Sequence, residues 1–211
     1  CYPGSGTYCV DLTENRITGS LGVGVSFSAA NRGMFSFNGV DYQAYIDLAR
    51  PSPLTGLQVP VTICAMFYPT TLNTFNVIYG LYASTSGGRL VSMLRSDRTT
   101  LRYYTSNSVG NFQQITLFTI AANNWYFATV VVSGNVASPS LKTYLNTSTA
   151  SPAIAALYAT PDLSVSPHVG ANSQKTECFT GYIPVIQIYN RALSDDEVYR
   201  NYQTMKRRYN I

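Results

Sequence analysis

The stretch GYIPVIQIYNRALSDDEVYRNYQTMKRRYNI, residues 181–211, contains two kinds of secondary structure in one run. Its first part, GYIPVIQIYN (181–190), is rich in β-branched and aromatic residues and predicts a strand. In its second part, Ser194 is followed three residues later by Glu197, which is the pattern of a helix capping box. The stretch therefore predicts a strand followed by one short α-helix over about 194–207.

The predicted helix has an apolar face and an uneven distribution of charge. Val198, Tyr202 and Met205 recur at helical spacing, so they share one side. Asp195 and Asp196 open the helix, and the basic run 206–208 lies near its end, so both groups suit the helix dipole. The basic run thus has a structural role that needs no ligand.

Before this ending, the chain consists of short apolar runs separated by clusters of Gly, Pro, Asn and Ser. Such runs predict the strands of a sandwich or barrel. The stretch 147–167 holds three prolines and little pattern, which predicts a long surface loop. The predicted strands are 34–39, 43–48, 59–69, 75–83, 89–94, 100–106, 113–120, 125–134, 141–146 and 181–190.

The composition indicates one domain with a weakly charged surface. A chain of 211 residues with 45% hydrophobic content can bury one sizeable core, so we expect a single domain over 1–211, with 1–10 as an N-terminal extension. Charged residues make up 11%, against about 25% in an average domain. The basic run is too local for a nucleic-acid-binding face. No apolar run approaches the roughly 20 residues that cross a bilayer, so we expect no membrane insertion.

The four cysteines leave three full pairings open: Cys1, Cys9, Cys64 and Cys178. Cys64 lies in an apolar run and is expected to be buried, whereas Cys1 and Cys9 either bridge a short loop or stay apart. No close cysteine pair occurs and His168 is the single histidine, which argues against zinc. A first residue other than Met indicates a processed product or a fragment, with a lipid-modified cysteine as the alternative.

Four segments together carry a family resemblance, at 11–46, 61–70, 123–146 and 168–202. Their specific pieces are F-x-F-N-G-V-D, a W-Y-x-x-x-x-V strand with a following Y-L-N, and the ending T-G-Y-I-x-x-x-x-I-Y-N-R-A-L-S. This order resembles the laminin-G-like branch of the concanavalin A-like lectin/glucanase superfamily. The resemblance implies an all-β fold, a jelly-roll sandwich of two antiparallel sheets. The terminal N-Y-x-x-x-K-x-R-Y is similar to members found in tail, fibre and capsid-surface proteins of bacteriophages and other large viruses.

The carboxylates do not match a glycosidase of that superfamily. Such enzymes need an acid and a nucleophile about 5 Å apart, and the resemblance implies the spacing E-x-D-x-x-E, which this chain lacks. The one tight acidic cluster belongs to the helix cap, so we predict no catalytic residues and no enzyme activity. The ten acidic residues are Asp11, Glu14, Asp41, Asp47, Asp97, Asp162, Glu177, Asp195, Asp196 and Glu197.

The sequence offers one candidate ligand-binding cluster, in LRYYTSN. Arg102, Tyr103, Tyr104 and Asn107 combine aromatic rings that can stack on sugars with groups that can bond hydroxyls. Tyr is also an ordinary strand residue, so sheet packing is the competing interpretation. Trp125 matches the sheet tryptophan of the family and is expected in the core.

Calcium is the one cofactor that the resemblance brings in, because many laminin-G-like domains hold it with loop carboxylates. The candidate ligands are Asp41, Asp97 and Asp162. Each is isolated and no D-x-D pattern occurs, which favours solvated turn residues. Asn146 begins an N-T-S glycosylation sequon, which matters only in a secreted eukaryotic chain.

Three functions compete on these grounds. The first is a non-catalytic virion module, a capsid decoration or tail-fibre tip, with glycan recognition through its loops. It implies a virion-surface or extracellular location, a homo-oligomeric assembly, and partners among virion proteins, surface proteins and cell-surface glycans. The second is a carbohydrate-binding module of a secreted or surface-anchored cellular protein. The third is a glucanase-like enzyme, against which the missing carboxylates argue.

Overall fold

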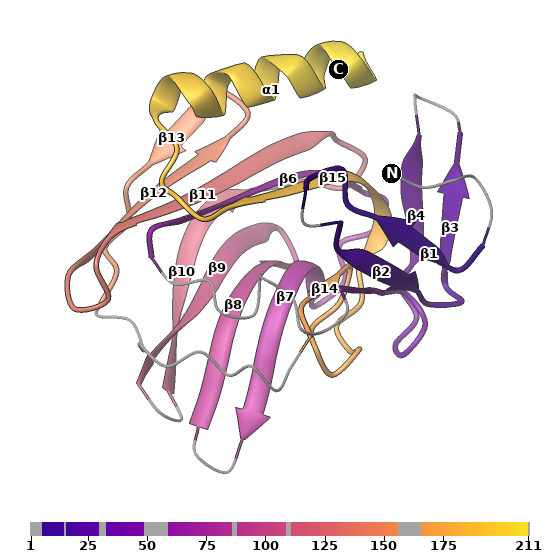
Figure 1. Cartoon of the computed structure of the whole chain (residues 1–211), viewed down its shortest axis with the longest axis horizontal. Coiled ribbons are helices and arrows are strands. Elements are labelled where there is room, and N and C mark those ends of the chain that lie inside the picture. The colour runs from indigo at the N-terminus through magenta and orange to yellow at the C-terminus, as the bar shows by residue number, and fades with distance from the viewer. Residues whose placement is uncertain are drawn as a thin grey trace.

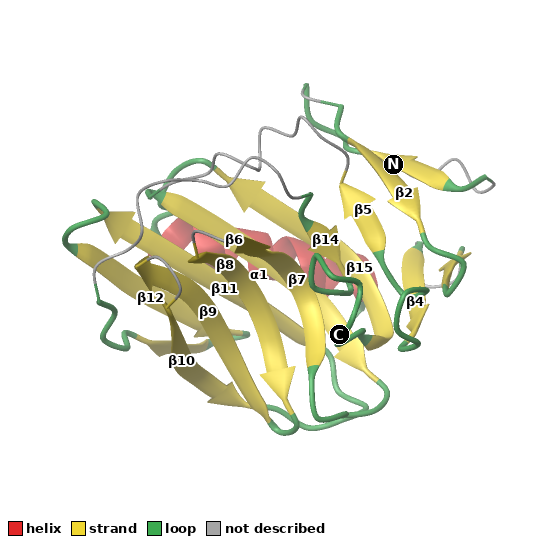
Figure 2. Ribbon diagram, turned by 90° about the horizontal axis from the view of Figure 1, so that it is seen from below, coloured by secondary structure: helices red, strands yellow, loops and turns green. Residues whose placement is uncertain are grey.

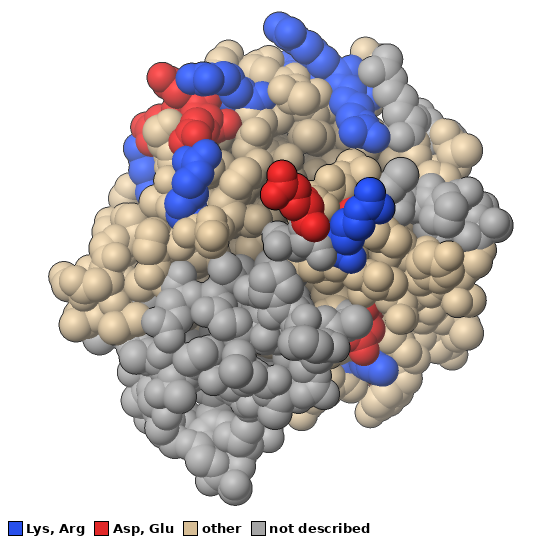
Figure 3. Space-filling model, in the orientation of Figure 1, with Lys and Arg blue, Asp and Glu red and all other residues tan. Residues whose placement is uncertain are grey.

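The computed structural model describes residues 6–14, 16–29, 33–48, 59–85, 88–108, 111–155 and 166–210. They form two antiparallel sheets that pack face to face, with one helix outside them (Figures 1 and 2). Among these residues, no helix is long and apolar enough to cross a membrane. Most of the described surface in Figure 3 is made of residues other than Lys, Arg, Asp and Glu, in agreement with the low content of charged residues.

The two sheets confirm the predicted jelly-roll sandwich. The eight-stranded sheet has, in spatial order, β1 (Tyr8–Val10), β2 (Thr18–Leu21), β5 (Ile46–Leu48), β14 (His168–Val169), β7 (Asn76–Thr85), β8 (Gly88–Asp97), β9 (Thr100–Ser108) and β10 (Asn111–Thr119). The seven-stranded sheet has β13 (Ser148–Ala150), β12 (Pro139–Leu145), β11 (Tyr126–Gly134), β6 (Val61–Pro69), β15 (Thr180–Tyr189), β4 (Met34–Asn38) and β3 (Val25–Ser28).

Strand β6 explains how the core is divided. Its residues Ile63 and Phe67 belong to the main cluster between the sheets, whereas Cys64 and Met66 belong to a second cluster under the helix. Successive side chains of a strand point to opposite faces. Because both faces of β6 are covered, its sequence is a continuous apolar run without the alternation of a half-wet strand.

The helix α1 (Asp195–Tyr209) packs on the outer face of the seven-stranded sheet (Figure 1). It buries Val198, Tyr202, Met205 and Tyr209, so the predicted apolar face is confirmed. The predicted capping box is also present, with Ser194 as the N-cap. The helix is two residues longer than the predicted 194–207 at its C-terminal end, because Tyr209 still packs on the sheet and the chain turns only at Asn210, with φ 53°.

Two contacts fix the approach to the helix and its far end. The buried Thr62 hydroxyl donates to the carbonyl of Arg191 at 2.8 Å and accepts from the amide of Leu193 at 3.0 Å. The Trp125 ring stacks on Tyr209 with 6.3 Å between the centroids. Trp125 is half-buried and packs against the second cluster, so it lies at the border of the core and not in the main core.

Some expectations need correction. The stretch 147–167 is not all loop, because Ser148–Ala150 pairs with β12, while 156–165 lies outside the described residues. Strands β1, β2 and β3 were not predicted. Cys64 is buried as expected. Cys9, Cys64 and Cys178 are free thiols, and any role of Cys1 lies outside the described residues.

Candidate functional site

Three connections meet at one end of the sandwich, and we call them the loop rim: 39–45 between β4 and β5, 70–75 between β6 and β7, and 170–179 between β14 and β15. Backbone bonds join them. The amide of Tyr42 donates to the carbonyl of Lys175 at 2.6 Å, and the amide of Thr70 donates to the carbonyl of Thr180 at 3.1 Å. The rim is therefore one connected surface, and not three independent loops.

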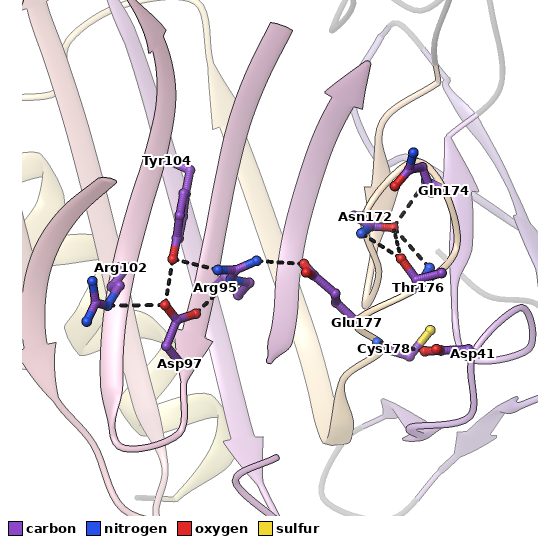
Figure 4. Close-up of polar contacts among 10 residues, drawn as sticks. All are labelled: Asp41, Arg95, Asp97, Arg102, Tyr104, Asn172, Gln174, Thr176, Glu177 and Cys178. Carbon is purple, nitrogen blue, oxygen red and sulfur yellow. Dashed lines mark hydrogen bonds and ion pairs between the residues drawn. The ribbon is translucent and has the colours of Figure 1, made fainter. Parts of the chain in front are cut away.

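The loop 170–179 is held by the buried side chain of Asn172 (Figure 4). Its carbonyl oxygen accepts from the amides of Gln174 at 3.1 Å and Thr176 at 2.9 Å, and its amide nitrogen donates to the Thr176 hydroxyl at 2.9 Å. Lys175 and Glu177 have φ of 60° and 57°. Non-glycine residues rarely occupy this region and do so where their surroundings fix them, so the loop has a defined shape.

A charged network connects this loop to the outer face of the eight-stranded sheet (Figure 4). The Arg95 guanidinium donates from Nε to Asp97 at 2.7 Å, from Nη1 to Glu177 at 2.7 Å, and from Nη2 to the Tyr104 hydroxyl at 2.6 Å. The Tyr104 hydroxyl in turn donates to Asp97 at 2.6 Å. The Arg95 guanidinium carbon also lies 4.2 Å from the centre of the Phe75 ring and 4.3 Å from that of Tyr104. Arg95 is thus fixed on every side and holds Phe75 in place.

The pKa shifts in this network indicate a structural role for Arg95 and Tyr104. Burial disfavours the charged form of Arg95, but the hydrogen bonds that Arg95 donates to Asp97 and Glu177, with the charge of Glu177, outweigh it and raise the pKa of Arg95. Burial, followed by the bond to Asp97, raises the pKa of Tyr104 to about 12. Arg95 therefore stays charged and Tyr104 stays neutral at physiological pH, so neither is poised to exchange a proton near neutrality.

Apolar and aromatic side chains protrude from this fixed base. Tyr42 is 68% exposed, Val40 45% and Phe75 39%. Gln174 is also exposed beside them on the same rim. An exposed ring next to an amide is a combination that binds sugars or protein surfaces, since the ring supplies apolar contact and the amide fixes orientation.

Residues 38–199 match the family described as the concanavalin A-like lectin/glucanases superfamily. The matched segment covers most of the sandwich and the start of α1. The chain belongs to this superfamily. No curated protein matches the sequence.

Solved structures with the same fold include several binding domains. The receptor-binding domain of botulinum neurotoxin type G has a TM-score of 0.70 at 14% identity, over 93% of this chain and 48% of that chain. The binding domain of botulinum neurotoxin DC, solved with rat synaptotagmin II, has 0.71 at 10% over 93% and 48%. The binding domain of paraclostridial mosquitocidal protein 1 has 0.69 at 16% over 93% and 49%. At these identities the likeness shows the fold, and the chain spans about half the length of each.

In this chain, the two rings of the predicted ligand-binding cluster lie on opposite faces of β9. Tyr103 lies in the main core and Tyr104 lies on the outer face under Arg95, and both rings are buried. Arg102 Nε lies 3.3 Å from Asp97 Oδ2. Asn107 is part of β9, but its side chain lies outside the described residues. Burial gives both rings a packing role, and their contact with a ligand stays a prediction.

The two candidate calcium ligands that the structure describes, Asp41 and Asp97, have different partners. Asp97 is engaged by Arg95, Arg102 and Tyr104, which leaves it little capacity for a metal. An oxygen of Asp41 lies 3.5 Å from the Cys178 amide, on the other side of Glu177 (Figure 4). Asp162 lies outside the described residues. Within the described part of the chain, no group of three or more His, Cys, Asp or Glu residues could hold a metal, so these residues do not fit a calcium site.

The sequence did not point to Arg95, Glu177, Tyr42 or Phe75. Arg95 and Glu177 are 82 positions apart, and no local pattern joins them. Tyr42 follows the F-N-G-V-D motif directly, and this position just beyond a strand was the one available signal.

Proposed function

We propose that this protein is a non-catalytic recognition module that binds a cell-surface glycan or receptor through the loop rim. The observation that carries the proposal is the exposure of Tyr42 and Phe75 beside fixed groups. Tyr42 is bonded to Lys175 in the loop that Asn172 holds, and the Phe75 ring packs on Arg95. A fixed base lowers the entropy that a ligand must overcome, so even a shallow surface can bind.

The same geometry supports binding over catalysis. Asp97 and Glu177 are the carboxylates of the Arg95 network, and both bond Arg95. Both carboxylates are therefore occupied by a structural contact. The binding domains among the solved structures of this fold agree with such a role.

We further propose that the module works as a repeated copy on the surface of a particle, a capsid decoration or a tail-fibre tip, and so has a virion-surface or extracellular location with other virion proteins as neighbours. The weakly charged surface, rich in Tyr, Ser, Thr and Asn, supports protein contacts of this kind. Repetition would raise avidity by orders of magnitude without any new contact. The alternative is a carbohydrate-binding module of a secreted or surface-anchored protein.

A glycan array and a cell-binding assay test the proposal. The isolated chain and a multivalent display of it are compared, each with the Tyr42→Ala/Phe75→Ala variant and with a Tyr8→Ala/Leu12→Ala control. The control removes two exposed apolar side chains from the N-terminal hairpin, away from the rim. We expect the rim variant alone to lose binding. If the wild type binds no glycan and no cell in either form, the recognition function is wrong.

The display comparison tests the second step separately. We expect the multivalent form to bind far more tightly than the isolated chain. Equal binding by both forms would contradict the proposal that repetition supplies the avidity, and would favour the secreted carbohydrate-binding module.

A further inference from the structure

The solvent-facing side of α1 forms a second surface. The helix covers the outer face of the seven-stranded sheet, and the main core lies against the inner face of that sheet. The second surface has a shallow hollow of about 590 Å³, and its residues recur one and two turns apart along the helix. The hollow is lined by Tyr199, Arg200, Gln203, Thr204, Arg207 and Arg208. These positions lie opposite the buried stripe of Val198, Tyr202, Met205 and Tyr209, so no packing against the sheet explains them.

The charge of this surface is not neutralised. Acidic and basic side chains are mixed over the N-terminal end of α1, whereas basic side chains alone lie over its C-terminal end (Figure 3). Among the described residues, the ion pairs between charged groups use Arg95, Arg102, Lys142 and Arg191 as cations. Arg200, Arg207 and Arg208 are in none of them. The hollow therefore presents three guanidinium groups whose fork of donors suits a carboxylate or a sulfate.

The helix dipole accounts for only part of this arrangement. Arg207 and Arg208 lie in the last turn, where the dipole favours cations. Arg200 lies in the middle of the helix, where that effect is absent. Tyr199 beside it is 57% exposed, although the other tyrosines of α1 are buried. An exposed ring and an arginine therefore lie side by side at mid-helix, and the dipole does not require either of them.

We propose that this hollow is a binding site for an acidic saccharide, a glycan that carries sulfate or carboxylate groups. Arg200 and Arg207 lie about 10 Å apart along the helix axis, a spacing that suits two anionic groups on alternate sugars. The Tyr199 ring offers a face for sugar C–H groups, and Gln203 and Thr204 between the arginines offer bonds to hydroxyls. The site goes beyond the function proposed for the loop rim and does not depend on it.

The decisive variant is Arg200→Gln/Arg207→Gln, with Arg16→Gln/Arg98→Gln as the control. Both variants remove two exposed positive charges, so they change net charge equally. Arg16 and Arg98 lie in turns of the eight-stranded sheet, whereas α1 covers the seven-stranded sheet, so the two variants differ in position. The probes are heparin oligosaccharides, hyaluronan, uncharged dextran, and phosphatidylcholine vesicles with and without phosphatidylserine. Binding is measured by calorimetry at low and moderate salt, after an unchanged Tm shows that each variant is folded.

We expect the wild type to bind heparin, or hyaluronan if a carboxylate alone suffices, and not to bind dextran. The α1 variant should lose about tenfold or more in affinity and show a flatter salt dependence, while the control stays within about twofold. Tyr199→Ala should weaken binding without changing the salt dependence, because it removes contact but no charge.

Three results would overturn the inference. Equal losses in the two double variants would mean that binding follows net charge and not this surface. Retention of vesicle binding with no saccharide binding would assign the surface to anionic lipid. The absence of binding to every anionic probe would leave the helix face solvated. The rim variant Tyr42→Ala/Phe75→Ala separates the two proposals, because heparin binding at α1 should survive it.

Discussion

The guanidinium of Arg95 bonds the carboxylate of Glu177 at 2.7 Å and so ties strand β8 to the loop before β15. This bond connects the two sheets. Arg95 lies on the outer face of the eight-stranded sheet, and Glu177 lies just before β15, an inner strand of the seven-stranded sheet between β6 and β4. The position of the loop rim thus depends on a side-chain pair and not only on backbone pairing.

Arg95→Met should lower the free energy of unfolding by about 2 to 3 kcal/mol, because it leaves the partly buried Glu177 without its cation and leaves Asp97 with Arg102 alone. Chemical denaturation measures the loss. Arg98→Met is the control, since its exposed side chain should change stability by less than about 0.5 kcal/mol. Equal stability of wild type and Arg95→Met would mean that the network is dispensable.

Tyr42→Ala alone should weaken ligand binding by about tenfold and leave the Tm unchanged, because the ring is 68% exposed and contributes little to packing. Titration of the ligand found on the array gives the affinity. A variant that loses stability instead would show that Tyr42 braces the rim.

Ser194→Ala should cost about 1 kcal/mol, which for a chain of this size lowers the Tm by about 3 °C. The Ser194 hydroxyl accepts from the amide of Glu197 at 3.4 Å, and alanine cannot replace it. Ser194→Asp keeps an acceptor and should remain close to wild type. An unchanged Tm in the alanine variant would indicate that this end of α1 is frayed.

Stability should depend on Glu197 in acid. Hydrogen bonds from Arg191 and then from the Ser194 amide lower the pKa of Glu197 from 4.5 to about 2. A lowered pKa means that the folded state favours the charged form, so its contribution is present above pH 4.5 and lost as the pH falls toward about 2. The Tm difference between wild type and Glu197→Gln should therefore shrink across this window. A constant difference would contradict the assigned pKa.

Gly181→Ala should destabilise the protein by about 3 kcal/mol. Gly181 has φ 139°, and a Cβ there would meet the carbonyl oxygen of Tyr68 in the neighbouring strand. The Cβ is attached directly to the backbone and the Tyr68 carbonyl is part of the backbone, so neither atom can move away by rotating a side chain. Thermal unfolding measures the loss, and a Tm near that of the wild type would mean that β15 can shift at this point.

The long strands and the helix could be predicted because their signals are local. The run around Cys64 and the capping box at Ser194 each lie within about ten residues. The strands β1 and β2 could not, because segments of three and four residues contain no periodicity. They form by pairing with each other and with β5, and no local pattern in the sequence reveals these partners.

The candidate site was harder for two reasons. Tyr103 and Tyr104 were grouped as one aromatic surface, yet adjacent residues of a strand point to opposite faces, so one of them had to enter the core. Arg95 and Glu177 contact each other only after both sheets have formed, and nothing near either residue predicts the partner. Sequence pattern locates faces well, but it does not locate a surface assembled from separate loops.

The place of α1 in the chain has a consequence during synthesis. A ribosome releases β6, β11 and β12 well before the helix that covers them, so a growing chain presents Met66, Phe127 and Val131 to solvent with nothing over them. Apolar surface of this kind is a target for chaperones and for aggregation. The nascent protein thus passes through a vulnerable interval, which ends when its last turns of helix emerge and dock.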